Sequence, residues 1–129
     1  DVCSSDLYTQ FAQGNLTAII NNVSPNFVFI LAGPEGLTKI AGTWSGSQGL
    51  TQFFNTLFTC ETYNAFQLKT FTTDGCRVDV EFDEEIVVLA TGKIVACSGL
   101  HSFVVNSNGQ MAKFRSYNDT YSVAWGYTE

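Results

Sequence analysis

Positive charge is scarce in this 129-residue sequence, which holds six Lys and Arg against twelve Asp and Glu and carries a net charge of −6. Because proteins that bind nucleic acids need a basic surface, we expect no DNA or RNA partner. No apolar run reaches the roughly 18 residues that a membrane-spanning helix needs, so we expect no membrane span. No glycine-rich phosphate-binding loop is present either.

Metal-binding and nucleophilic motifs are also missing. His101 is the only histidine, and none of the four cysteines forms a Cys-x-x-Cys pair. We therefore predict no metal site and no Ser-His-Asp or Cys-His catalytic group. The even cysteine count allows two disulfides or four free thiols. If disulfides form, we expect Cys60–Cys97, on neighbouring strands, and Cys3–Cys76.

Few lysines, an even cysteine count and a first residue other than Met favour a secreted protein. Three glycosylation sequons begin at Asn15, Asn22 and Asn118. Sequons of this kind arise by chance at a similar frequency, so their use is left open.

Apolar residues, by contrast, are abundant. They make up 45% of the chain and include eleven Phe, five Tyr and two Trp. This composition predicts one packed domain over residues 1–129. Most of the aromatic side chains should form an ordinary core, but their number favours an additional pocket for a long or flat apolar ligand.

Hydrophobic periodicity predicts helices in the first half of the chain and strands in the second. Ser4–Gln13 is expected to be helical, and Asn15 to cap a second short helix that Pro25 stops. Ser45 or Ser47 should open a third helix. The predicted strands are 27–31, 37–44, 62–73, 77–90, 93–106 and 110–124. This order predicts an α+β fold in which a strongly curved, mixed or antiparallel sheet of about six strands wraps over three helices and encloses an apolar pocket.

The chain resembles the nuclear-transport-factor-like superfamily of cone-shaped α+β folds, which includes SnoaL-like polyketide cyclases, ketosteroid isomerases and the C-terminal domain of the orange carotenoid protein. The resemblance rests on four stretches in a fixed order, namely 11–16, 23–27, 42–46 and 109–119. It covers about residues 5–120 and implies the cone fold. Because this superfamily hosts many functions, activity must be argued from individual positions.

Several catalytic groups of the superfamily are missing from the matching positions. The isomerase tyrosine matches Leu7, with Tyr8 one residue along, and the general-base aspartate matches Leu31. A leucine cannot transfer a proton, so isomerase chemistry of that type is not expected. The epoxide-hydrolase pattern is also incomplete, because Ser116 stands where that pattern has an aspartate.

His101 occupies the position where the resemblance places a hydrogen-bond donor to a ligand oxygen. SnoaL-like cyclases have a histidine there, and the carotenoid protein has a tryptophan that contacts a keto oxygen. We therefore expect His101 to be a polar anchor in the pocket; a structural histidine is the alternative. Strand alternation and the family pattern place Phe114, Ser116 and Asn118 toward the pocket and Asp119 away from it.

Another strand carries alternating acids, and these have two interpretations. The residues Asp79, Glu81, Asp83 and Glu85 share one face of strand 77–90. A solvated sheet face is the simpler interpretation of this row, and a cation site is the alternative.

Two functions follow from these observations. The first is a carrier for an apolar small molecule, such as a carotenoid or another isoprenoid or polyketide pigment. The second is a SnoaL-like cyclase, isomerase or dehydratase in which His101 is the general acid/base, assisted by Tyr8, Tyr117 or Asp119. No cofactor is specified beyond a possible bound carotenoid or other apolar ligand, and a homodimer is expected. The expected ligand-binding residues are His101, Leu7, Tyr8, Phe11, Phe27, Leu31, Trp44, Phe54, Phe103, Phe114, Ser116 and Asn118.

Overall fold

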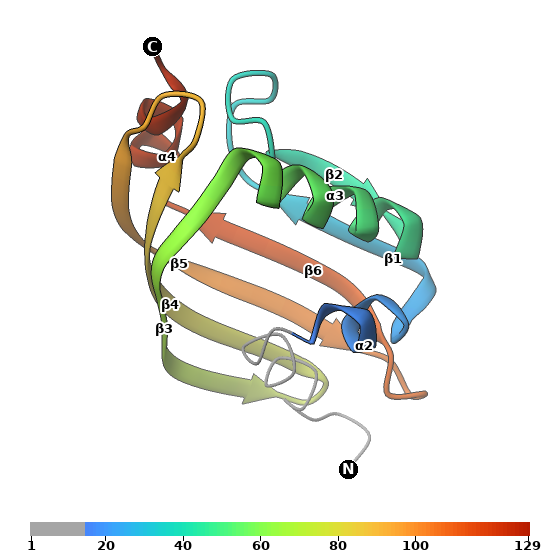
Figure 1. Cartoon of the computed structure of the whole chain (residues 1–129). Coiled ribbons are helices and arrows are strands. Elements are labelled where there is room, and N and C mark those ends of the chain that lie inside the picture. The colour runs from blue at the N-terminus through green and yellow to red at the C-terminus, as the bar shows by residue number, and fades with distance from the viewer. Residues whose placement is uncertain (1–14) are drawn as a thin grey trace.

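The computed structural model describes residues 15–129, which form three helices and six strands (Figure 1). The helix predicted for Ser4–Gln13, and with it Leu7, Tyr8 and Phe11, lies outside the described residues. The helices are α2 (Leu16–Ile20), α3 (Gly46–Cys60) and α4 (Thr120–Tyr127). The strands are β1 (Val23–Leu31), β2 (Gly42–Ser45), β3 (Glu61–Asp74), β4 (Arg77–Val88), β5 (Ile94–Val105) and β6 (Met111–Asn118).

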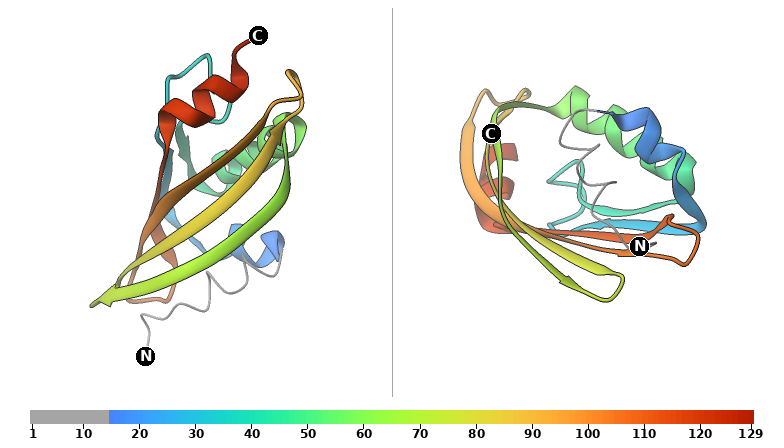
Figure 2. Two further views of the ribbon diagram at one scale, coloured as in Figure 1. Left: turned by 90° about the vertical axis from the view of Figure 1, so that its left-hand side faces the viewer. Right: turned by 90° about the horizontal axis from the view of Figure 1, so that it is seen from below.

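The six strands form one mixed sheet in the order β2-β1-β6-β5-β4-β3. Strands β1 and β6 are parallel, and every other neighbouring pair is antiparallel. The β3–β4 pairing shifts register at two places, between Tyr63 and Ala65 and between Leu68 and Thr70. Such irregularities bend a sheet, and Figure 2 shows the sheet curving around α2 and α3. The predicted α+β cone is therefore confirmed.

Helix α3 supplies much of the core because its apolar residues recur at helical spacing. Leu50, Phe53, Phe54 and Leu57 are buried, and Phe53 lies 4.3 Å from Phe29 of β1, measured between ring centroids. The prediction that Asn15 caps the second helix is also confirmed. Asn15 is the N-cap of α2, and its side chain accepts a hydrogen bond from the Ala18 amide.

Several predicted boundaries differ from the structure, and the strand predicted for 27–31 begins already at Val23. The strand predicted for 37–44 is only Gly42–Ser45, because the preceding residues form turns. Helix α2 ends at Ile20, and Pro25 lies inside β1 instead of ending the helix.

The last predicted strand is wrong beyond Asn118, where the chain turns into helix α4. Asp119 caps this helix by accepting hydrogen bonds from the amide and hydroxyl of Ser122. Lys93, in the β4–β5 turn, fixes the other end by donating to the carbonyl oxygens of Trp125 and Thr128. Helix α4 therefore lies over one end of the sheet (Figure 1), and one of the three described helices is C-terminal.

Cys60 and Cys97 are free thiols. The predicted Cys60–Cys97 disulfide is therefore wrong, and the Cys3–Cys76 pairing involves a residue outside the described part of the chain. No helix within residues 15–129 is long and apolar enough to cross a membrane.

Candidate functional site

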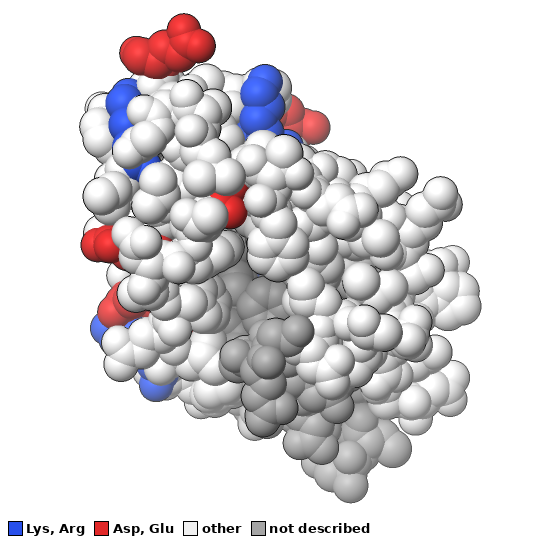
Figure 3. All heavy atoms as spheres, viewed as in Figure 1, with Lys and Arg blue, Asp and Glu red and all other residues white. Residues whose placement is uncertain are grey.

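A cavity of about 420 Å³ lies between the helices and the concave face of the sheet. Phe53, Phe54 and Leu57 of α3 form one wall, and Phe27 and Phe114 from the sheet face them. A volume of this size suits a small organic ligand. In Figure 3 the surface over α3 is almost free of charged side chains.

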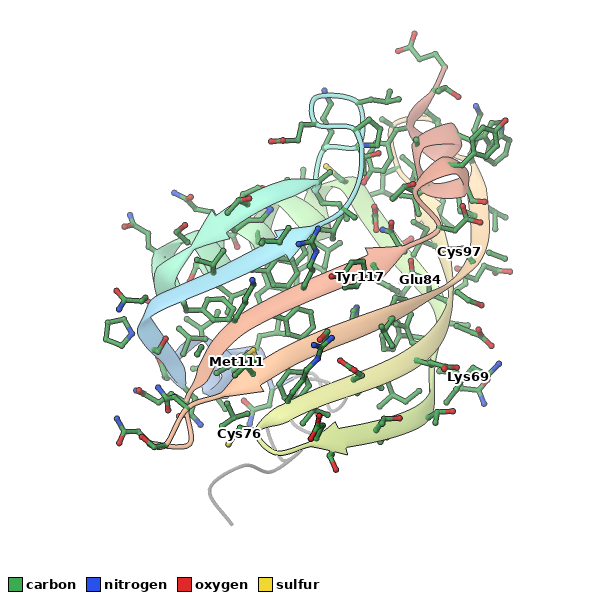
Figure 4. The ribbon with its side chains drawn as sticks, turned by 180° about the vertical axis from the view of Figure 1, so that it is seen from behind. Lys69, Cys76, Glu84, Cys97, Met111 and Tyr117 are labelled. Carbon is green, nitrogen blue, oxygen red and sulfur yellow. The ribbon has the colours of Figure 1, made fainter. Side chains whose placement is uncertain are left out.

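The two ends of the cavity differ in polarity. Strand β6 lines it from Met111 to Asn118, a span of about 23 Å at roughly 3.3 Å per residue. Near Met111 the lining is apolar and includes Leu16 and Ile19 of α2. At the α4 end the lining includes Glu61, Glu84 and Asn118. Figure 4 shows Met111 and Glu84 far apart on the sheet.

His101 lies between these ends and is enclosed by aromatic rings. Its side chain is only 7% exposed, and its ring centroid lies 4.2 Å from that of Phe82 and 5.0 Å from that of Phe114. Burial lowers the pKa of His101 to about 3. His101 is therefore uncharged at neutral pH. In this state its ring can donate and accept hydrogen bonds, but it does not act as a general acid.

Glu84 is the group in the cavity best suited to exchange a proton near neutral pH. It is half-buried, and its carboxylate accepts a hydrogen bond from the Cys97 thiol, with 3.6 Å between Oε2 and Sγ; the two residues are neighbours in Figure 4. Burial, followed by the negative charge of Glu61, raises the pKa of Glu84 to about 7. Burial also raises the pKa of Cys97 to about 12, so this thiol stays protonated.

Glu61 is a second buried carboxyl at the same end. It follows α3 directly, is 2% exposed, and its Oε2 accepts a hydrogen bond from the Tyr127 hydroxyl. Burial raises the pKa of Glu61, whereas the hydrogen bond from Tyr127 acts to lower it. Helix α4 therefore contributes directly to this acidic end of the cavity.

The structure brings seven of the predicted ligand-binding residues into the cavity lining: Phe27, Leu31, Phe54, His101, Phe114, Ser116 and Asn118. Trp44 and Phe103 are not among the lining residues. Trp44 packs edge-on against Phe53 and donates from Nε1 to the Ile40 carbonyl oxygen, and Phe103 is a buried core residue that stacks on Phe114. Whether the lining residues bind a ligand stays a prediction.

The last strand faces as predicted. Phe114, Ser116 and Asn118 line the cavity. Asp119 does not line it, but the reason is that it lies beyond the end of β6 and caps α4, not the strand alternation from which its outward direction was expected. Tyr117, one of the assistants expected for an enzyme, is 42% exposed and outside the lining.

Sequence reasoning missed Glu61 and Glu84. Glu84 continues the inward-facing series of Val78, Val80 and Phe82 at a spacing of two residues, so the alternation of β4 could have located it. Glu61 gave no comparable signal, because its hydrogen-bond partner, Tyr127, comes from the distant C-terminal helix.

The acids Asp79, Glu81, Asp83 and Glu85 form a solvated face of β4, which is the simpler of the two interpretations given above. Asp83 forms an ion pair with Lys69, and Asp79 forms one with Arg77. Both pairs involve partly exposed side chains, as expected of a solvated face. Residues 15–129 contain no group of three or more His, Cys, Asp or Glu side chains that could hold a metal ion.

Comparison with known structures identifies the class of fold. No family model and no curated protein matches the sequence. An NTF2-like protein from Burkholderia thailandensis is 20% identical and superposes with a TM-score of 0.83 over 97% of this chain and 94% of its own. A candidate SnoaL-like polyketide cyclase from Mesorhizobium loti is 16% identical, with a TM-score of 0.74 over 88% and 93%.

A third similar structure is that of TerC co-crystallised with polyporic acid, which is 20% identical, with a TM-score of 0.75 over 94% of this chain and 92% of its own. The chain therefore has the NTF2-like, SnoaL-like cone fold that its sequence resembles. At these levels of identity the likeness concerns the fold, and the function has to be argued from the cavity.

Proposed function

We propose that this protein is an acid–base enzyme that acts on a small, mostly apolar molecule, with Glu84 as the proton-transfer group. The observation that carries the proposal is a carboxyl group inside an apolar cavity whose pKa is raised to about 7. A general base works best when its pKa lies near the operating pH, because both protonation states are then available. The similar fold of a candidate polyketide cyclase supports this class of reaction.

The proposed reaction is an isomerisation or cyclisation that begins with the removal of a proton from carbon. The Glu84 carboxylate takes a proton from the carbon beside a carbonyl group, and the electron pair moves onto the carbonyl oxygen. A neutral imidazole N–H of His101 or the hydroxyl of Ser116 can donate to that oxygen. In an isomerisation, Glu84 then returns its proton at another carbon. In a cyclisation, the enolate carbon instead attacks a second carbonyl carbon of the same molecule, and Glu84 returns its proton to the alkoxide oxygen that forms. Neither route needs an external oxidant or reductant.

This proposal gives His101 a different task from the general acid/base expected from the sequence. Because the pKa of His101 is lowered to about 3, the protonated imidazolium form is not populated at neutral pH. His101 can then donate a hydrogen bond from its neutral ring but cannot be the general acid. Its enclosed neutral ring favours a second candidate function, which is a carrier that holds the oxygen of an apolar pigment such as a carotenoid. The co-crystallisation of TerC, a protein of similar fold, with polyporic acid is consistent with either function.

The test compares Glu84→Gln with Glu85→Gln, because Glu85 lies next to Glu84 but on the opposite face of β4. Each variant and the parent protein would be incubated in D₂O with cyclic β,γ-unsaturated ketones of increasing size. Deuterium incorporation would then be followed by NMR. We expect exchange in the parent and in Glu85→Gln, and a loss of at least about 100-fold in Glu84→Gln.

Equal exchange in the two variants would contradict the role of Glu84. The carrier would be favoured by the absence of exchange together with a visible absorption band and one apolar molecule per chain in a solvent extract of the protein from its natural source.

A further inference from the structure

The α4 end of the cavity offers hydrogen-bond acceptors but no positive charge. Glu61 and Glu84 both line it, and neither forms an ion pair within residues 15–129. None of the six Lys and Arg side chains of the sequence lines the cavity, and residues 1–14 contain no basic residue. Two carboxyl groups are therefore held at one end of an apolar cavity without a cation from the chain.

Asn118 adds a further acceptor at this end. Its Oδ1 atom is buried and has no hydrogen-bond partner in the part of the chain that the structure describes. A buried acceptor without a partner destabilises the fold, because it has lost its hydrogen bonds to water. A ligand that donates hydrogen bonds at this point would remove that destabilisation.

Two aromatic side chains of β3 lie at the same end of the cavity. Phe66 pairs with Glu84 across β3 and β4, and Tyr63 packs edge-on against Phe66 with ring centroids 5.9 Å apart. Both rings line the cavity. Aromatic faces attract ammonium groups, most strongly where water is excluded.

We propose that the cavity binds an elongated apolar amine, with its ammonium group between Glu61, Glu84 and Asn118 and its hydrocarbon or aromatic body directed toward Met111. The ammonium group supplies the missing positive charge and donates to the carboxylates and to the amide oxygen. The apolar body fills the part of the cavity lined by Phe27, Phe114 and α2.

An organic cation fits these surroundings better than a metal ion does. The described residues provide no group of three His, Cys, Asp or Glu ligands, whereas hard metal ions require several oxygen ligands. The long apolar lining next to the carboxyl groups has no role in binding a metal but would bury the body of an amine. The inference goes beyond the proposed reaction, and it rests on that proposal only in placing the ligand in this cavity.

The test uses three ligands with the same body and different heads: 4-phenylbutylamine, 4-phenylbutanol and 4-phenylbutanoate. Binding to the full chain would be measured by calorimetry at pH 8, where Glu84 is ionised and the amine is protonated. We expect the amine to bind at least about 10-fold more tightly than the alcohol, a difference of about 1.4 kcal/mol, and the carboxylate to bind most weakly. Glu84→Gln should remove the preference for the amine, and Glu85→Gln should keep it.

Two outcomes would overturn the inference: equal binding of amine and alcohol, or tightest binding of the carboxylate. The ligand series on the parent protein decides this even if a variant fails to fold. Because the experiment measures binding without turnover, its result is separate from that of the deuterium-exchange test. A protein that prefers the amine but shows no exchange would retain this inference and lose the proposed activity.

Discussion

Proton binding by Glu84 links the cavity to the stability of the fold. Its pKa of about 7 in the folded protein lies above the ordinary value of 4.5, so the folded state holds the proton more tightly than the unfolded state does. The ionisable groups that act directly on Glu84 are Glu61 from β3 and Cys97 from β5. Tyr127 from α4, Tyr63 and Cys60 lie around Glu61, and Asp119 acts on Cys97. The stabilisation is complete below pH 4.5 and is lost as the pH rises through about 7.

We therefore expect the free energy of unfolding to fall by up to about 3 kcal/mol between pH 5 and pH 8 through Glu84. Glu84→Gln should flatten this dependence, whereas Glu85→Gln should keep it. Urea unfolding curves at the two pH values measure the difference. Parallel pH dependence in the parent and Glu84→Gln would show that Glu84 titrates normally.

Gly99 on β5 allows the close packing that holds Phe82 against His101. A methyl group on Gly99 would lie 2.5 Å from Cζ of Phe82 and 2.5 Å from the carbonyl oxygen of Tyr117. Gly99→Ala should therefore displace the Phe82 ring and destabilise the protein by about 1–3 kcal/mol. The midpoint of urea unfolding measures this loss.

Val104→Ala, on the same strand but 39% exposed, is the control for Gly99→Ala and should cost much less. If Gly99→Ala were as stable as the parent, the Phe82 ring would have to move at little cost, and the tight enclosure of His101 would be in doubt.

At the scale of elements, the sequence predicted those that carry their own local signals. Asn15 at the start of α2 and the helical spacing of Leu50, Phe53 and Leu57 are patterns within single elements. The parallel pairing of β1 with β6 joins distant residues, such as Phe29 and Phe114. No local pattern encodes such a pairing, so only the resemblance to a known fold indicated its architecture.

Helix α4 was not predicted because its large apolar residues alternate with smaller ones, a pattern typical of a strand. Tyr121, Val123 and Trp125 alternate with smaller residues, and in the helix Val123 is buried while Tyr121 and Trp125 remain exposed. Asp119 followed by Ser122 was the available signal, since this spacing fits a capped helix. With α4 missed, the sequence could not reveal that Tyr127 meets Glu61.

Helix α4 should influence the pKa of Glu84 through the hydrogen bond between Tyr127 and Glu61. In Tyr127→Phe, Glu61 loses the hydrogen bond that lowers its pKa, so more of Glu61 is protonated at neutral pH. Less negative charge then acts on Glu84, and we expect the titration midpoint of Glu84 to fall below that of the parent. A ¹³C NMR titration of the Glu84 carboxyl carbon, assigned with Glu84→Gln, measures the shift.

Tyr121→Phe is the matched control for this titration, because Tyr121 lies on the same helix and is 83% exposed. It should leave the midpoint unchanged. An unchanged or higher midpoint in Tyr127→Phe would show that Glu61 does not control Glu84.

At the scale of the whole molecule, the two faces of the sheet are chemically distinct. The concave face forms the cavity, whereas the convex face carries the acids of β4 on one side of β5 and Lys113 and Arg115 of β6 on the other. Arg115 Nε is buried and has no hydrogen-bond partner among residues 15–129. For two copies related by a two-fold axis parallel to β5, Arg115 of each copy would face Asp79 of the other, because both residues pair with Ser102 of β5.

The homodimer expected from the sequence should therefore form through the convex face and weaken as salt is added. Arg115→Glu should shift the protein toward monomer at low ionic strength, because it places a negative charge opposite Asp79 of the second copy. Lys39→Glu makes the same charge change in the loop before β2 and should leave the dimer intact. Light scattering coupled to size-exclusion chromatography measures the mass of each variant. A monomer at every concentration would exclude the dimer, and a dimer indifferent to both Arg115→Glu and salt would place its interface on another face.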